Sequence, residues 1–199
     1  MAEYHLQTAD LPTAVSKLCA GDRVLLSGTV YTSRDAAHKR IFQLLDSHSP
    51  LPYPLEGAVI YYAGPTPAQQ GMAAGSCGPT TSGRMDPYAP RLLDLGLTAM
   101  IGKGERSSAV VDAIVRNKAV YFCAVGGAGA LIAGCIEQAE EIAFQDLGCE
   151  SVKRFTVKDL PLVVAIDSTG RNLFEEGRAQ YYRALKTGAD RIFCLRPFL

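Results

Sequence analysis

Residues 97–125 read LTAMIGKGERSSAVVDAIVRNKAVYFCAV, and this stretch decides the fold class. Two short apolar runs, 97–101 and 119–125, predict buried strands. Between them a glycine-containing turn is followed by apolar residues at helical spacing, which predicts a helix over 107–117. Strands that alternate with helices in this way are typical of an α/β domain.

The same alternation extends in both directions along the chain. Before this stretch we expect a helix over 11–19, a strand over 23–30, a helix over 34–45, a strand over 58–63 and a helix over 87–95. After it we expect a helix from GGAG at 126–129 to about residue 140, short strands around 143, 152–157 and 162–166, and an amphipathic helix over 173–185. Strand-only stretches beside alternating ones imply a mixed sheet in one α/β domain. No linker divides the chain, so residues 1–199 are expected to form a single domain.

Composition excludes several classes of function. The chain has 199 residues, with 20 Lys and Arg against 20 Asp and Glu. This balance gives no overall positive field, so we expect no nucleic-acid partner. No apolar run reaches the roughly 18–20 residues that span a bilayer, and the start resembles no secretory signal. We therefore expect no membrane association and a cytoplasmic location.

Cysteine spacing argues against a metal site on this chain alone. Structural zinc and most iron–sulfur sites use at least one closely spaced pair of ligands, and no CxxC occurs here. Cys77 differs from the other cysteines because it lies in a glycine- and proline-rich segment, 64–83. A segment of this length between a strand and a helix is usually functional, so we expect a functional loop there. The six cysteines are Cys19, Cys77, Cys123, Cys135, Cys149 and Cys194.

Three expected strand-to-helix junctions each carry a cation beside glycine or hydroxyl residues. The cations are Arg34, Arg84 and Lys103. A cation near the start of a helix opposes the helix macrodipole, and local rules are often broken at functional sites. In open α/β sheets ligands gather at the carboxyl ends of the strands. The three junctions therefore predict one anion site where these side chains converge.

Two questions stay open at this stage: whether the cations bind a ligand at all, and which anion that ligand is. Each cation could point into water or pair with a neighbouring acid, namely Asp35, Asp86 or Glu105. A phosphate ligand is disfavoured because neither GxxxxGK[ST] nor GxGxxG follows any of these strands. Since arginine grips a carboxylate with two hydrogen bonds, a dicarboxylate held by Arg34 and Arg84 is the simplest ligand.

Hydroxyl groups and one histidine accompany these cations. Thr80, Thr81 and Ser82 could cap a helix, or a hydroxyl between arginines could be acidified and then accept a proton. His38 lies four residues after Arg34, where it could make a structural hydrogen bond or transfer a proton. The residues alone do not choose between these roles.

Several motifs together resemble the C-terminal half of the class I iron–sulfur fumarases. In split versions of this family that half is a separate β subunit, and the β subunit of L-tartrate dehydratase is similar. The resemblance runs in order from about Gly21 to Gly170, which leaves residues 171–199 as a tail of unknown role. The motifs are GTVYTSRDAAHKR, YYAGPTP, CGPTTSGRMD, IGKGERS, AVGGAGAL, QDLG and VAIDSTG.

The resemblance implies a swivelling β/β/α domain and the reversible hydration of fumarate to L-malate. It also implies a 4Fe-4S cluster held by three cysteines of a partner α subunit. This chain would therefore act in a hetero-oligomer, and it would bind no metal alone. By the same resemblance, Arg34, Thr80, Arg84 and Lys103 match positions that bind the dicarboxylate. Thr80 matches a proposed catalytic base, and Arg34 matches an arginine that lowers its pKa. Supporting positions follow for Asp35, His38, Thr81 and Asp86.

Two other functions remain compatible with these residues. The chain could belong to an enzyme acting on L-tartrate or a related hydroxy-dicarboxylate. It could also be an anion-binding module that works without any α subunit.

Overall fold

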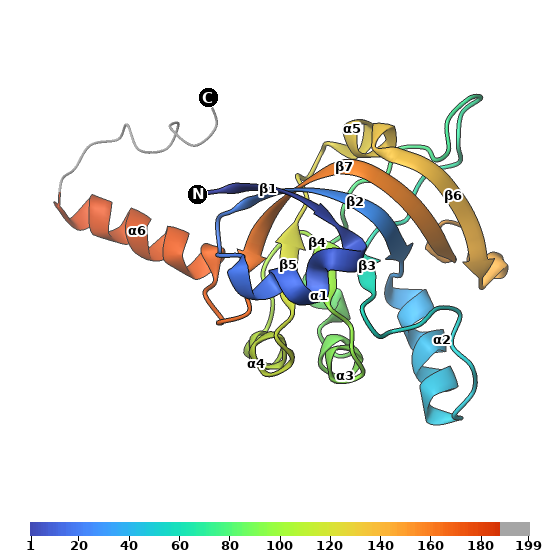
Figure 1. The fold of residues 1–199 in the computed structure, drawn as a ribbon, viewed down its shortest axis with the longest axis horizontal. Coiled ribbons are helices and arrows are strands. Elements are labelled where there is room, and N and C mark those ends of the chain that lie inside the picture. The colour runs from blue at the N-terminus through green and yellow to red at the C-terminus, as the bar shows by residue number, and fades with distance from the viewer. Residues whose placement is uncertain (188–199) are drawn as a thin grey trace.

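The computed structural model describes residues 1–187, which form one seven-stranded mixed sheet with helices around it (Figure 1). The strand order is β1-β2-β3-β4-β5-β7-β6, and β2 also pairs with β7, so the strands from β2 to β5 and β7 close into a ring. β1 to β5 run parallel, whereas β7 is antiparallel to β2, β5 and β6. The strands are β1 (Glu3–Gln7), β2 (Arg23–Thr32), β3 (Val59–Tyr61), β4 (Ala99–Gly102), β5 (Val120–Cys123), β6 (Ile136–Ala143) and β7 (Val152–Ile166).

Helices lie on both sides of this sheet. In Figure 1, α2, α3 and α4 lie below the sheet, α5 lies above it, and α6 projects away from the body. The α-helices are α1 (Leu11–Ala14), α2 (Asp35–Asp46), α3 (Ala89–Asp94), α4 (Ser108–Asn117), α5 (Gly129–Gly134) and α6 (Leu173–Thr187). Four short 3₁₀ helices are η1 (Thr8–Asp10), η2 (Val15–Lys17), η3 (Ser82–Met85) and η4 (Gln145–Glu150).

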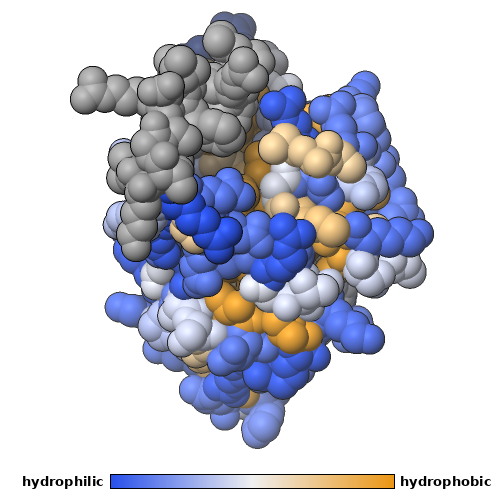
Figure 2. Space-filling model, turned by 90° about the vertical axis from the view of Figure 1, so that its left-hand side faces the viewer, coloured by the Kyte–Doolittle hydropathy of each residue, from blue (hydrophilic) through white to orange (hydrophobic). Residues whose placement is uncertain are grey.

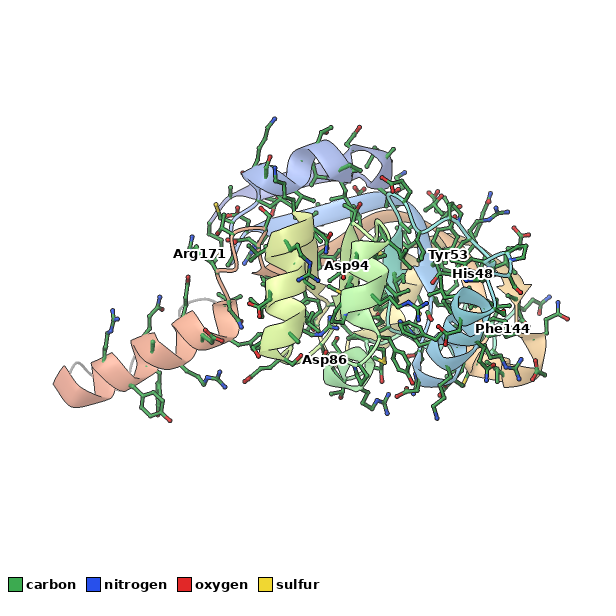
Figure 3. All side chains as sticks on the ribbon, turned by 90° about the horizontal axis from the view of Figure 1, so that it is seen from below. His48, Tyr53, Asp86, Asp94, Phe144 and Arg171 are labelled. Carbon is green, nitrogen blue, oxygen red and sulfur yellow. The ribbon has the colours of Figure 1, made fainter. Side chains whose placement is uncertain are left out.

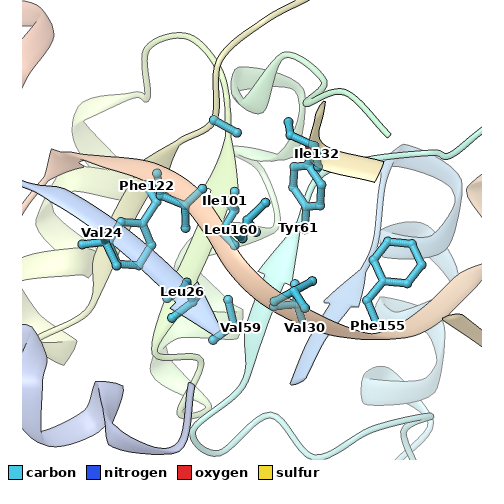
Figure 4. Close-up of a cluster of buried hydrophobic side chains, with 14 of the residues drawn as sticks. Val24, Leu26, Val30, Val59, Tyr61, Ile101, Phe122, Ile132, Phe155 and Leu160 are labelled. Atoms are coloured by element: carbon cyan, nitrogen blue, oxygen red, sulfur yellow. The ribbon is translucent and has the colours of Figure 1, made fainter. Parts of the chain in front are cut away.

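Strand alternation divides the apolar residues between two cores. Val59 and Tyr61 of β3 point into the core enclosed by the ring, together with Phe122 and Phe155 (Figure 4). Ile60, between them in sequence, faces the second core under α2, α3 and α4. Because side chains of a strand alternate between faces, a run that is apolar throughout marks a strand covered on both sides. This is why the central strands carry almost no polar residue.

The structure confirms the mixed α/β architecture and the strand–helix–strand unit at 97–125, which forms β4, α4 and β5. It also confirms the helix after residue 173. Residues 188–199 of the expected tail, and Cys194 within them, lie outside the described residues. Viewed from the α6 end, the surface is mostly hydrophilic with small hydrophobic patches (Figure 2). No helix within residues 1–187 is both long and apolar enough to cross a membrane.

Two sequence expectations were wrong, and one strand was not expected. The helix expected to reach residue 140 ends at Gly134, and Ile136–Ala143 forms β6. This segment has a helix-favouring Glu and Ala composition, but it is an exposed edge strand that gains its ladder from β7, so tertiary pairing overrides propensity. The two strands expected at 152–157 and 162–166 are one strand, β7, and β1 was not expected at all.

Helix positions at two junctions also differ from expectation. Arg34 is the N-cap residue of α2 rather than part of its first turn. Lys103 lies five residues before α4, so the macrodipole of that helix does not act on it strongly. Arg84 lies in η3, which is a single short turn. The clash between cations and helix dipoles is therefore a weaker signal than the sequence suggested.

Candidate active site

The candidate site lies at the carboxyl ends of β2, β3 and β4. These strands are parallel neighbours, so the segments that leave them start at one edge of the sheet. Arg34 follows β2, and Lys103 follows β4. Thr80 reaches the same edge from the long segment after β3. The three cation-bearing junctions therefore lie side by side.

Backbone hydrogen bonds fix Thr80 between β3 and β4. The Thr80 N–H donates to the Tyr62 carbonyl at 2.7 Å, and the Lys103 N–H donates to the Thr80 carbonyl at 3.3 Å. The Ser82 N–H donates to the Lys103 carbonyl at 2.9 Å, while the Ser82 hydroxyl accepts from the Lys103 N–H at 3.0 Å. The hydroxyl segment thus extends the sheet edge, and the position of Thr80 is set by strand geometry.

Arg84 donates a hydrogen bond to the Thr80 hydroxyl, with 2.5 Å between Nη2 and Oγ1. Thr80 is half-buried, whereas Thr81 is exposed. Thr81 is the N-cap residue of η3, yet its side chain makes no capping hydrogen bond. A positive guanidinium on a hydroxyl oxygen favours the alkoxide form, so of these two threonines Thr80 has the environment of a potential base.

The Asp35 carboxylate connects two of the three cations. Its Oδ2 lies 3.3 Å from Nη2 of Arg84 and 3.8 Å from Nη2 of Arg34. Asp35 is in the first turn of α2, where a negative charge is favourable. Both arginines therefore pair with a nearby acid, as the alternative to an anion site proposed, but the shared carboxylate also brings them to one place.

Lys103 keeps its ammonium group available. Its side chain is exposed and has no ion pair among the described residues, and the neighbouring Glu105 pairs with Arg178 instead. Gly126 lies near this side chain, and a Cβ there would make an ordinary van der Waals contact with Cδ of Lys103 at 3.8 Å. An exposed ammonium beside two exposed or half-buried arginines is suited to a ligand with more than one negative charge.

Asp86 does not contact the three cations. Its Oδ1 accepts a hydrogen bond from Nε of Arg106 at 2.7 Å, and its Oδ2 accepts from the Ser107 N–H at 2.6 Å. Asp86 lies near the ends of α3 and α4 (Figure 3). Together these bonds join the segment after Thr80 to the segment after Lys103. Asp86 therefore stabilises the position of both segments without contacting the three cations.

Arg106 is a residue that sequence reasoning missed. Its side chain is fully buried, and Cζ lies 5.3 Å and 5.0 Å from the ring centroids of Tyr62 and Tyr121. The Tyr121 hydroxyl donates to the Gly104 carbonyl at 2.8 Å. A buried arginine needs a compensating carboxylate. Arg106 is the arginine of the GERS motif, and nothing in the sequence of that motif indicates that its side chain is buried.

His38 is buried and held by its own helix start. Nδ1 lies 3.0 Å from the Arg34 carbonyl and 2.8 Å from the Ser33 hydroxyl. Because a carbonyl only accepts, Nδ1 carries the proton, and Nε2 is left without a hydrogen-bond partner in the protein. Burial lowers the pKa of His38 to about 4, with smaller effects from the Arg34 carbonyl, Arg106 and Asp35. This geometry fits the structural hydrogen bond better than proton transfer.

The low pKa of His38 predicts acid-sensitive stability. The unfolded chain takes up a proton below pH 6.5, but the folded state does not until about pH 4, so stability is present above 6.5 and lost as pH falls towards 4. The loss from this group reaches about 3 kcal/mol at pH 4. Urea unfolding at several pH values should show a shallower decline for His38→Asn than for the unsubstituted chain. Equal slopes in the two proteins would contradict the assignment.

A cavity of about 390 Å³ lies between the long segment after β3 and residues of η4, β6 and β7. Lys153 and Glu141 supply its charged lining, and their Nζ and Oε2 lie 3.8 Å apart. Much of the remaining lining is apolar or small, and it comes from Pro65, Thr66, Pro67, Ala68, Ala73, Ala74, Ala139, Gly148, Cys149 and Phe155. Residues 65–68, 73 and 74 of the long segment thus form one side of this cavity.

Residues 1–187 do not fit a 4Fe-4S cluster. No three His, Cys, Asp or Glu side chains in this part of the chain are grouped to hold a metal ion. Burial raises the pKa of Cys77 to about 12, so this thiol is not a thiolate near neutral pH. Cys149 is exposed and stands alone.

Comparison with known proteins shows which proteins this chain is similar to in sequence. Fumarate hydratase 2 of Leishmania major is 37% identical over 187 residues, covering 87% of this chain and 33% of that protein. The aerobic class I fumarate hydratase of Escherichia coli K12 is 35% identical over 164 residues, covering 81% and 30%. A putative L(+)-tartrate dehydratase subunit beta of Methanocaldococcus jannaschii is 36% identical over 177 residues, covering 86% and 91%.

The chain therefore spans about a third of the length of these fumarate hydratases and nearly all of the tartrate dehydratase subunit. A family model described as the fumarase C-terminus matches residues 1–177. This match includes every residue of the candidate site and confirms the resemblance seen in the motifs. The chain belongs to the fumarase C-terminus family.

Proposed function

We propose that this chain is the β subunit of a two-subunit class I fumarate hydratase, which hydrates fumarate reversibly to L-malate. The observation that carries the proposal is the cluster formed by Arg34, Asp35, Arg84 and Thr80, with Lys103 on the neighbouring strand end. It offers three cations to a dicarboxylate and a hydroxyl under a guanidinium. The missing two thirds of the fumarate hydratase relatives would be supplied by a separate α subunit.

Each residue has a defined part in this reaction. Arg84 and Lys103 bind the carboxylates of the substrate, and Arg34 completes the positive wall. In the dehydration direction, Thr80 as an alkoxide accepts the proton from C3 of malate. The C–H electron pair then forms the C2–C3 double bond, and the C2 hydroxyl takes up a proton from an acidic group of the α subunit and leaves as water. Arg84 stabilises the alkoxide because it donates to the same oxygen, whereas the family resemblance gives this role to Arg34.

The α subunit completes the site in this proposal. It would hold the 4Fe-4S cluster through three cysteines, since the described part of this chain has no such set. The domain would swivel to close over the substrate, as the family resemblance implies. We further propose that the assembly is a cytoplasmic hetero-oligomer.

L-Tartrate or a related hydroxy-dicarboxylate is the second candidate substrate. The observation that favours it is the 36% identity to a putative L(+)-tartrate dehydratase subunit beta, a similarity that extends over 91% of that subunit. Both substrates carry two carboxylates, so the cation set accepts either. The site residues on this chain do not separate them.

Turnover by the reconstituted complex decides between the candidates. The chain should be co-expressed under anaerobic conditions with a cysteine-bearing α subunit and assayed with fumarate, L-malate and L-tartrate. We expect hydration of fumarate by the complex and none by this chain alone, because residues 1–187 offer no grouped set of metal ligands. Turnover of tartrate only would favour the second candidate. Failure of any such α subunit to co-purify, with dicarboxylate binding retained, would instead indicate an anion-binding module.

A further inference from the structure

Glu150, the last residue of η4, bridges two parts of the β2–α2 junction. Its Oε2 accepts a hydrogen bond from the Ala36 N–H at 3.1 Å. Its Oε1 lies 3.4 Å from Nη2 of Arg34. One carboxylate thus contacts both the helix that begins after Arg34 and the guanidinium of Arg34 itself.

The start of α2 needs such a group. Its N-cap residue is Arg34, whose side chain makes no capping hydrogen bond. The first N–H groups of a helix have no partner within the helix, and a carboxylate there is favoured by the macrodipole. Glu150 therefore caps α2 from a segment 114 residues away in sequence.

Gly64 and the backbone of η4 pack closely around the Arg34 side chain. A Cβ at Gly64 would lie 2.9 Å from Nη1 of Arg34 and 3.0 Å from the Cys149 carbonyl, so only glycine leaves room there. The Arg34 side chain is 21% exposed, and its Nε is buried without a hydrogen-bond partner. Glu150 and Asp35 are the two acids that hold this guanidinium.

We infer that Glu150 is a positioning residue that holds Arg34 against the Asp35 carboxylate, which Arg34 shares with Arg84, while capping α2. This inference rests on the proposed function, in which Arg34 acts on the dicarboxylate. Because Glu150 also offsets one positive charge, its neutralisation should leave the site more attractive to a dianion but less ordered. The expected signature is a loss of turnover without a loss of substrate affinity.

The same 3₁₀ helix supplies a matched control. Asp146 forms an ion pair with Arg40, also on α2, but farther from the helix start. Asp146→Asn therefore removes one η4–α2 ion pair without touching Arg34. Glu150→Gln keeps one oxygen that can accept from the Ala36 N–H, and it replaces the carboxylate oxygen that faces Arg34 by an uncharged amide NH₂.

The first experiment uses this chain alone and does not depend on turnover. Side-chain ¹⁵N NMR should show the Arg34 guanidinium, assigned by comparison with Arg34→Lys, as a restrained group. We expect Glu150→Gln to broaden or shift the Arg34 signals and to leave those of Arg40 unchanged. Asp146→Asn should do the reverse. Unchanged Arg34 signals in Glu150→Gln would overturn the inference, whatever the complex catalyses.

The second experiment measures kcat and KM of the reconstituted complex with its preferred dicarboxylate. We expect Glu150→Gln to lower kcat about tenfold with KM unchanged or lower, and Asp146→Asn to leave both near normal. A raised KM with normal kcat, or equal effects of the two substitutions, would overturn the positioning role. An unsubstituted complex that turns over no dicarboxylate would instead count against the proposed function, and the NMR result would still test Glu150.

Discussion

Thr80→Val should abolish dicarboxylate turnover by the reconstituted complex while leaving the fold intact. Valine has nearly the shape of threonine, and the hydrogen bonds that fix residue 80 use only its backbone. What the substitution removes is the hydroxyl that accepts from Arg84. Proton transfer by a positioned group contributes about 10²–10⁴-fold to rate, so kcat should fall by that factor. Steady-state assays of both reaction directions measure it.

Thr80→Ser is the matched control, because it keeps the hydroxyl and loses only a methyl group. We expect it to retain most of the activity. Thr81→Val tests specificity, since Thr81 is exposed and its side chain makes no capping bond to η3. Near-normal kcat for Thr80→Val would show that Thr80 takes no part in the chemistry. A loss of kcat in Thr81→Val as large as that in Thr80→Val would show that the hydroxyl of Thr80 is not the specific base.

Strand order explains why so much of the site could be predicted. Arg34 and Lys103 follow parallel strands, and the ends of parallel strands meet at one sheet edge whatever the details of packing. Thr80 reaches that edge because its segment extends the ladder beyond β3 and β4. Local patterns therefore placed the cations together without knowledge of the pairing.

Contacts between distant segments could not be read in the same way. Glu150 meets Ala36 only because η4 folds back on α2, and Asp86 meets Arg106 only because two strand ends are adjacent. Residues 136–140 of β6 were expected to continue a helix. Their ladder with β7 decides instead that they form a strand. Such contacts depend on tertiary pairing, which no local period encodes.

Asp86→Ala should produce a large loss of stability. The Arg106 guanidinium is fully buried between Tyr62 and Tyr121, and Asp86 is its ion-pair partner among the described residues. Removing one partner of a buried pair leaves an uncompensated charge and costs about 3–5 kcal/mol. Urea unfolding at neutral pH measures the change. Asp46→Ala is the control, because Asp46 pairs with Arg91 at the surface and should cost less than about 1 kcal/mol.

A second variant separates the buried charge from the lost packing. Arg106→Met removes the cation and fills much of the same space between the two tyrosine rings, so Asp86→Ala combined with Arg106→Met should be less destabilised than Asp86→Ala alone. A double variant that loses the sum of both single effects would show that Asp86 stabilises the fold mainly by capping the Ser107 N–H. Because the Asp86–Arg106 pair joins the segments that carry Thr80 and Lys103, its loss should also weaken dicarboxylate binding in the fraction of chains that remain folded.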